Sequence, residues 1–183
     1  MKMINRILII ILFLITSIAW GAEAHKTLLF KYTFPIEGKD LQRINLPEWV
    51  AERSSKLDFD EKYDLSLHMN PFYLPVDFDN DNKIDIAVWI EERSTGKKGV
   101  AIFIKSQKVI HLAGAGEKLG MGDGDYSWAN LWLSFDKTEL KKSHWEKNPP
   151  RNIGQGILLR QFESSSGAIY WNGKALEWYQ VSD

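Results

Sequence analysis

Residues 84–90 read Ile84-Asp85-Ile86-Ala87-Val88-Trp89-Ile90, and this run decides how the rest of the chain is interpreted. Neighbouring side chains of a β-strand point to opposite faces of its sheet. The aliphatic residues at positions 84, 86, 88 and 90 therefore share one face, whereas Ala87 and Trp89 share the other. Because both faces are apolar, we expect this strand to be covered on both sides.

The segments that follow repeat the strand pattern. Arg93–Lys98 has the composition of a turn, and Val100–Lys105 alternates in the same way as the first strand. A second turn at Ser106-Gln107 leads into a further strand candidate, Lys108–Leu112. These segments predict a three-stranded antiparallel meander.

Helical signals are few and short. Asn45 is a candidate cap for a helix that ends near Leu57, with Pro47 in its first turn. Asp136-Lys137-Thr138-Glu139 resembles a capping box at the start of a second, polar helix. Further strand patterns occur at residues 27–34, 128–135 and 157–162.

The C-terminal region contains a hairpin signal. Ile169–Trp171 and Lys174–Leu176 are strand-like, and Asn172-Gly173 lies between them. Asn-Gly favours a type I′ turn, because both central residues of that turn need a positive φ angle. The fold class predicted from these patterns is mainly β: a single small domain of antiparallel meanders and hairpins, sandwich-like or partial-propeller-like, with one or two short helices.

The N-terminus has the features of an export signal. The positively charged Lys2 and Arg6 lie before the apolar run Ile7–Ile18. Ala22-Glu23-Ala24 then has small residues at the two positions that a signal peptidase recognises. The apolar run is shorter than the roughly 20 residues that span a bilayer. We therefore expect residues 1–24 to be a cleaved signal peptide and residues 25–183 to form one β-rich domain. The mature protein is expected to be periplasmic or secreted, with no stable membrane anchor after cleavage.

Composition excludes several classes of function. The formal net charge is −1 and no basic stripe is present, which argues against a nucleic acid as partner. The chain has no cysteine, so disulfides, thiol nucleophiles and thiolate metal sites are excluded. No serine, histidine and carboxylate set has the spacing of a known hydrolase motif, which leaves open whether the protein is an enzyme.

One acidic segment carries the strongest site signal. Residues 77–85 read Asp77-Phe78-Asp79-Asn80-Asp81-Asn82-Lys83-Ile84-Asp85. Calcium takes about six to eight oxygen ligands in flexible geometry, and alternating aspartates on a tight loop supply them. The predicted ligands of a structural Ca²⁺ ion are the side chains of Asp77, Asp79, Asp81 and Asp85 and the backbone carbonyl of Lys83. The alternative is a polar turn without an ion, since Asp and Asn are common turn residues.

The spacing Asp-x-Asp-x-Asp-x-x-x-Asp, followed directly by the apolar run Asp85-Ile86-Ala87-Val88, resembles the calcium loop of FG-GAP/VCBS-type repeats. The resemblance covers roughly Val76–Leu112. In that family each loop precedes a strand of a propeller blade and binds calcium, which is what the resemblance implies here. Propellers of the family contain several such repeats, whereas this chain contains one loop.

Small size, export and the lack of a catalytic motif favour a binding or accessory role. The expected partner is an unidentified protein or glycan, and one possibility is an inhibitor or immunity-type partner of another protein. Exposed tryptophans are typical of sugar-binding modules. Trp89 and Trp178 are expected in the core, and Trp128 is the candidate for an exposed ring.

The alternative is an enzyme that acts on cell-wall or other polysaccharide, either a hydrolase or a histidine-brace copper oxygenase. The brace hypothesis depends on His25 as the first mature residue, because a terminal amine and imidazole together bind copper. His68, His111 or His144 would complete that site.

Overall fold

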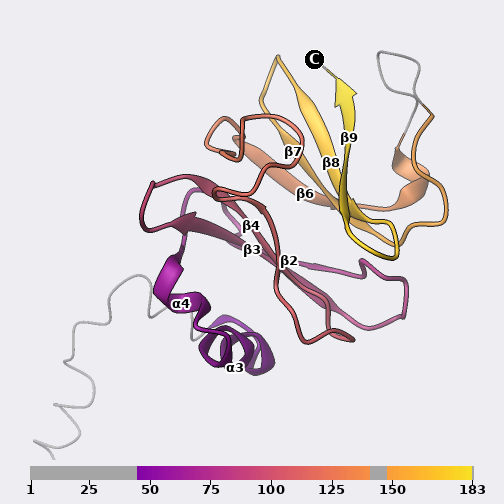
Figure 1. Ribbon diagram of the computed structural model, residues 1–183. Helices are drawn as coiled ribbons and strands as arrows, with labels where there is room; N and C mark the ends of the chain where they lie inside the picture. Colours follow the sequence, from indigo (N-terminus) through magenta and orange to yellow (C-terminus); the bar gives the residue numbers. More distant parts are fainter. Residues whose placement is uncertain (1–44, 141–147, 183) are drawn as a thin grey trace, which may run out of the picture. The chain divides into compact units, whose positions relative to one another are not determined.

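The computed structural model describes residues 45–140 and 148–182, which form two antiparallel sheets (Figure 1). The first sheet contains β1 (Tyr63–Leu65), β2 (Tyr73–Val76), β3 (Asp85–Glu92), β4 (Lys98–Phe103) and β5 (His111–Gly114). The second contains β6 (Leu131–Phe135), β7 (Gly156–Arg160), β8 (Ser166–Trp171) and β9 (Leu176–Ser182). Two helices, α3 (Glu48–Lys56) and α4 (Phe59–Lys62), precede the strands. The expectation of a mainly β fold is confirmed.

Several predicted features lie outside the described residues. They are the signal peptide at residues 1–24, the strand candidate at residues 27–34, His25 and His144. No helix of the described part of the chain has the length and apolar character needed to cross a membrane.

Strand β3 is the centre of the first sheet and is buried on both faces. It pairs with β4 along one edge, and with β1 and β2 end to end along the other. Ile86, Val88 and Ile90 pack in a core beneath α3 and α4, whereas Ala87 and Trp89 belong to a core shared with the second sheet. The predicted double coverage of this strand is therefore confirmed.

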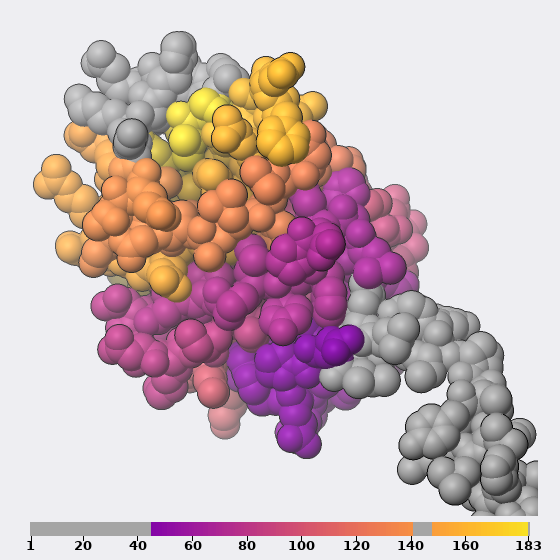
Figure 2. Space-filling model, turned by 180° about the vertical axis from the view of Figure 1, so that it is seen from behind, coloured from indigo at the N-terminus to yellow at the C-terminus, as the bar shows by residue number. Residues whose placement is uncertain are grey.

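The two sheets pack through the face that carries Trp89. Its ring lies 5.3 Å from the ring of Trp132 on β6, at an interplanar angle of 72°. Trp132 also donates an Nε1 hydrogen bond of 2.7 Å to the Pro71 carbonyl, which precedes β2. In the space-filling view, residues of the first sheet (magenta) meet the segment around β6 (orange) along a continuous seam (Figure 2).

The boundaries of the predicted meander need correction. Ile84 lies just before β3 and its side chain is 53% exposed, because ladder pairing begins only at Asp85 opposite Val76. Strand β5 starts at His111, not at Lys108, since the burial that stabilises a strand is found at Ala113 and not at Val109. Strand β6 likewise starts at Leu131, three residues after the predicted start.

Helix termini are partly as predicted. A cap at Asn45 predicted a helix that starts at Leu46. The N-cap residue of α3 is instead Pro47, so the helix starts two residues later, at Glu48. Asp136 and Glu139 form both hydrogen bonds of a capping box around a single 3₁₀ turn, Lys137–Glu139. The capping box is therefore confirmed, whereas the residues that would continue a helix, 141–147, lie outside the described part.

The C-terminal hairpin is present, but its turn differs from the prediction. Trp171 pairs with Leu176, so the loop has four residues, and only Gly173 has a positive φ, at +95°. The Asn172 side chain accepts hydrogen bonds from the backbone N–H groups of Lys174 and Ala175, at 2.8 and 2.9 Å. This side-chain turn replaces the type I′ turn, because it satisfies two loop donors without a positive φ at Asn172.

Trp128 is not the exposed ring that the sequence suggested. It packs against Tyr126 at 6.2 Å and Trp178 at 6.3 Å, and all three belong to the core between the sheets. Burial of Trp89 is confirmed, and Trp178 is partly buried against the same core. The glycine-rich segment before Trp128 folds back onto these rings, with Gly120 against Trp178 and Gly122 against Trp128, and so covers a side chain that was expected to be exposed.

Candidate metal centre

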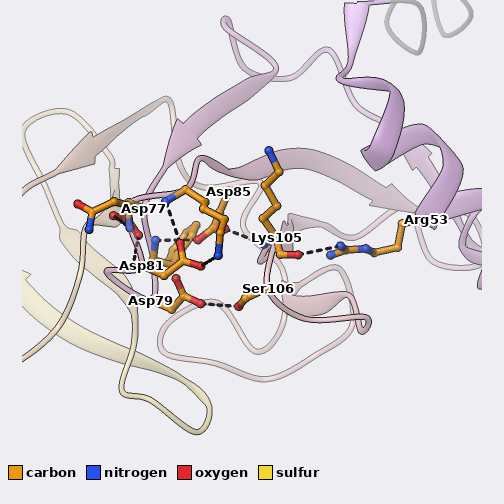
Figure 3. Close-up of polar contacts among 10 residues, drawn as sticks. Arg53, Asp77, Asp79, Asp81, Asp85, Lys105 and Ser106 are labelled. Atoms are coloured by element: carbon orange, nitrogen blue, oxygen red, sulfur yellow. Dashed lines mark hydrogen bonds and ion pairs between the residues drawn. The ribbon is translucent and has the colours of Figure 1, made fainter.

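The acidic loop joins β2 to β3, and the pairing of Val76 with Asp85 brings its two ends together. Asn80 and Asn82 have φ angles of +59° and +63°. Asparagine tolerates this left-handed conformation better than other residues with a side chain, so the sequence permits the tight path. The loop therefore brings its aspartate side chains close to one another, as Figure 3 shows.

Three of the predicted ligands come together. Asp77, Asp79 and Asp85 each place a carboxylate oxygen so that the three atoms lie within 4.8 Å of one another. Asp85 is buried, and the other two are partly buried. These are the oxygen ligands that a hard cation such as Ca²⁺ prefers.

The two other predicted ligands interact with each other. The Lys83 ammonium lies 2.6 Å from Asp81 Oδ2, and the Lys83 backbone N–H donates to Asp81 Oδ1 at 2.8 Å. These hydrogen bonds lower the pKa of the Asp81 carboxyl, and they raise the pKa of Lys83. Asp81 is thus paired with Lys83, and it is not among the three carboxylates whose oxygens come within 4.8 Å of one another, those of Asp77, Asp79 and Asp85. A Ca²⁺ ligand at the Lys83 carbonyl stays a prediction.

Backbone donors hold two members of the triad in place. Asp77 accepts hydrogen bonds from the N–H groups of Asp81 (3.1 Å) and Asn82 (3.0 Å). Asp85 accepts from the N–H groups of Phe78 (2.9 Å) and Lys105 (2.7 Å). All four carboxylate oxygens of these two residues are therefore oriented by the backbone.

Asp79 is the member of the triad in which one carboxylate oxygen lacks a hydrogen-bond partner. Its Oδ2 accepts a hydrogen bond of 2.6 Å from the Ser106 hydroxyl, whereas its Oδ1 is buried and has no hydrogen-bond partner. Leaving a charged oxygen buried and unpaired is costly, and such groups in folded proteins call for a bound ion or water. A cation beside Oδ1 would supply the missing partner.

Electrostatics within the triad act mainly on Asp85. Its pKa is raised from 3.8 to about 6, chiefly by burial and also by the charges of Asp79 and Asp77, although the two backbone N–H donors oppose the shift. The ionised form of Asp85 is thus disfavoured in the folded protein as it stands. A cation bound by the triad would reverse this effect by favouring the carboxylate.

This shift predicts a pH dependence of stability in the presence of chelator. Because the folded-state pKa of Asp85 lies above its ordinary value, ionisation destabilises the fold above about pH 6. The destabilisation disappears as the pH falls through 6 toward 4. Lowering the pH from 7.5 to 5 should therefore raise the free energy of unfolding, by at most about 1.5 kcal/mol. Urea denaturation in EDTA at several pH values measures it.

Asp85→Asn is the control for this pH dependence, because an amide does not titrate. Most of the rise should be absent in that variant, whatever its absolute stability. A wild-type free energy of unfolding that falls from pH 7.5 to 5 in EDTA, with the same slope in Asp85→Asn, would contradict the assignment.

The loop is also anchored by residues that its own sequence does not reveal. Lys105 and Ser106, in the turn after β4, hold Asp85 and Asp79, and the Arg53 guanidinium on α3 reaches the Lys105 carbonyl (Figure 3). Arg53 also donates a hydrogen bond of 2.8 Å to the Ile104 carbonyl. Gln155 pairs with Asp77 through two hydrogen bonds, of 2.9 Å to its side chain and 2.8 Å from its backbone N–H. The only sequence signal for these contacts was the expected turn at residues 106–107.

Other candidate residues lie elsewhere. Asp123 pairs with Lys118 at 2.5 Å, and Asp125 accepts from the Lys98 and Ser127 backbone, so neither joins the triad. His68 Nε2 lies 2.9 Å from the Ala129 carbonyl, and His111 Nε2 lies 2.7 Å from Gln107 Oε1. The copper hypothesis depends on His25, which is outside the described residues, and stays a prediction.

Comparisons with known proteins do not assign the chain to a family: no family model matches it, and neither a curated protein nor a solved structure is significantly similar to it.

Proposed function

We propose that this is an exported binding protein in which Asp77, Asp79 and Asp85 hold one structural Ca²⁺ ion. The observation that carries the proposal is the buried Asp79 Oδ1, which has no partner and lies beside two further carboxylates. Three carboxylates at this separation repel one another unless a cation joins them. Calcium fits better than magnesium, because Mg²⁺ demands near-ideal octahedral geometry, whereas Ca²⁺ accepts the irregular oxygen set of a loop.

The ion would act at a junction of the fold. Lys105 and Ser106 connect the triad to the turn after β4. Gln155 connects it to the segment directly before β7 of the second sheet. An ion that fixes the loop therefore also fixes the approach of these two segments. A hollow next to the loop also supports a binding role, because segments of both sheets line it and a ligand could occupy it.

Export is proposed from the sequence of residues 1–24, and one experiment tests it together with the ion. Native mass spectrometry of the protein isolated from its own cells should give the mass of residues 25–183 plus one calcium ion. Treatment with EDTA should remove the calcium and leave the polypeptide mass unchanged. A polypeptide that retains residues 1–24 would refute export with cleavage, and a metal-free mass in millimolar calcium would refute the ion site.

A further inference from the structure

A hollow of about 540 Å³ opens beside the acidic loop. It is lined by the loop, by the turn after β4, by residues 152–154 before β7, and by the end of β8 with its hairpin loop. Its apolar lining comes from Phe78, Ile153 and Trp171, which are otherwise buried and so present only part of each side chain. The volume is in the range of small-molecule sites, and the lining combines a small apolar base with a larger polar part.

The polar lining is rich in hydrogen-bond donors. Lys137 is exposed and has no ion pair with a described residue, and three amides, those of Asn80, Gln107 and Asn152, line the same hollow. The Gln107 Oε1 atom already faces His111 at 2.7 Å, which leaves its amide nitrogen to donate elsewhere. Among the described residues that line the hollow, Asp79 alone carries a carboxylate. Such a surface favours a ligand with many acceptor oxygens.

Asp79 belongs both to this hollow and to the triad. Five of the six triad carboxylate oxygens already accept hydrogen bonds from the protein, and the sixth is Asp79 Oδ1. Three carboxylates do not complete the six to eight oxygens that Ca²⁺ takes. Because Asp79 lines the hollow as well, an ion held by the triad would lie next to the wall of the hollow.

On this basis, and resting on the proposed calcium site, we infer that the hollow binds a uronic-acid sugar of an acidic polysaccharide. Carboxylate and hydroxyl oxygens of the sugar complete the coordination of the ion and accept hydrogen bonds from Lys137 and the amides. The C–H face of the pyranose ring packs on the apolar base that includes Trp171. A neutral sugar lacks the charge that the ion and Lys137 match, and an acidic peptide lacks the hydroxyls that the amides match.

Isothermal titration of the full mature protein with trigalacturonate tests this inference. Binding is expected in 1 mM calcium and should weaken at least a hundredfold in EDTA. Maltotriose, a neutral trisaccharide, and triglutamate, an acidic peptide, are the comparison ligands, and each should bind at least tenfold more weakly than trigalacturonate. Equal binding of maltotriose would overturn the role of the carboxylate, and equal binding of triglutamate would overturn the assignment to a sugar.

Two variants locate the site without disturbing the triad. Lys137→Gln should weaken trigalacturonate binding about three- to fivefold, the range of an exposed ion pair. Asn152→Gly removes an amide but retains the backbone, since Asn152 has a φ of +57° that glycine adopts readily, and it should weaken binding comparably. Arg160→Gln, exposed at the opposite end of β7, is the matched control and should leave the affinity unchanged.

The outcomes separate this inference from the proposed function. If calcium binds the protein but trigalacturonate does not, the sugar site is refuted and the ion site stands. If trigalacturonate binds equally well in EDTA, the contribution of the ion to the hollow is refuted. If neither calcium nor trigalacturonate binds, both proposals fail.

Discussion

Calcium at a hundred times its dissociation constant is expected to raise the melting temperature of the protein without residues 1–24 by roughly 5–10 °C over the value in EDTA. An ion that binds only the folded state stabilises it by about 2.7 kcal/mol at that excess. For a domain of this size, each kcal/mol shifts the melting temperature by about 2–4 °C. The physical reason is that folding holds Asp77, Asp79 and Asp85 within 4.8 Å of one another whether or not a cation is present.

Two aspartates of the same loop provide a matched pair for this experiment. Asp79→Ala removes the carboxylate with the unpartnered oxygen and should abolish most of the calcium-dependent shift, while relieving repulsion in the ion-free protein. Asp81→Ala removes a carboxylate that is paired with Lys83 and should retain most of the shift. Differential scanning calorimetry in millimolar calcium and in EDTA measures both variants against wild type.

Identical melting of wild type in the two solutions would end the calcium hypothesis. Loss of the shift in Asp81→Ala together with its retention in Asp79→Ala would show that the ion is held by Asp81 and not by Asp79, and would refute the triad as its ligand set.

Trp89→Ala is expected to lower the free energy of unfolding by about 3–5 kcal/mol, the usual range for removal of a buried large aromatic ring. Trp89 is fully buried on β3 and faces the second sheet. Its ring contacts Trp132 at 5.3 Å and stacks on His68 at 5.8 Å. The substitution therefore leaves a cavity at the contact between the sheets, where the surrounding strands cannot close fully.

Leu133→Ala is the control for the tryptophan substitution. Leu133 lies on β6, in the same sheet as Trp132, but its side chain is 37% exposed, so its loss should cost less than about 1 kcal/mol. Urea denaturation of both variants at constant calcium gives the comparison. A loss below 1 kcal/mol for Trp89→Ala would contradict the packing of the two sheets through this residue.

Much of the sheet architecture followed from local patterns. The alternation at residues 84–90 predicted a strand covered on both faces, because the side-chain period of a strand is two and both sets of side chains there are apolar. The capping box at Asp136 and Glu139 was equally local, since its two hydrogen bonds join residues three apart. Strand ends were less predictable, and Ile84 and Val109 were assigned to strands although both are exposed. Apolar character does not say where pairing partners begin.

Some features of the acidic loop are set by its own residues, whereas others depend on contacts with distant parts of the chain. The spacing of its aspartates predicted a cation site, and the positive φ observed at Asn82 is one that asparagine tolerates. The sequence did not show that Lys83 would engage Asp81, since the side chains of a loop have several partners within reach. Nor did it show which oxygen would be left without a partner, because that depends on Ser106 and on donors from other strands.

The sequence by itself thus determined the class of fold, the central strand and the place in the chain where carboxylates gather, because each is set by residues within a few positions of one another. Only the tertiary structure decided which three carboxylates meet, how deeply Asp85 is buried, and that Lys137, Gln107 and Trp171 line a hollow beside them. Those residues lie up to 94 positions from Asp77 in the printed sequence. They come together because burial of both faces of β3 packs the second sheet against the first, and no local pattern records that packing.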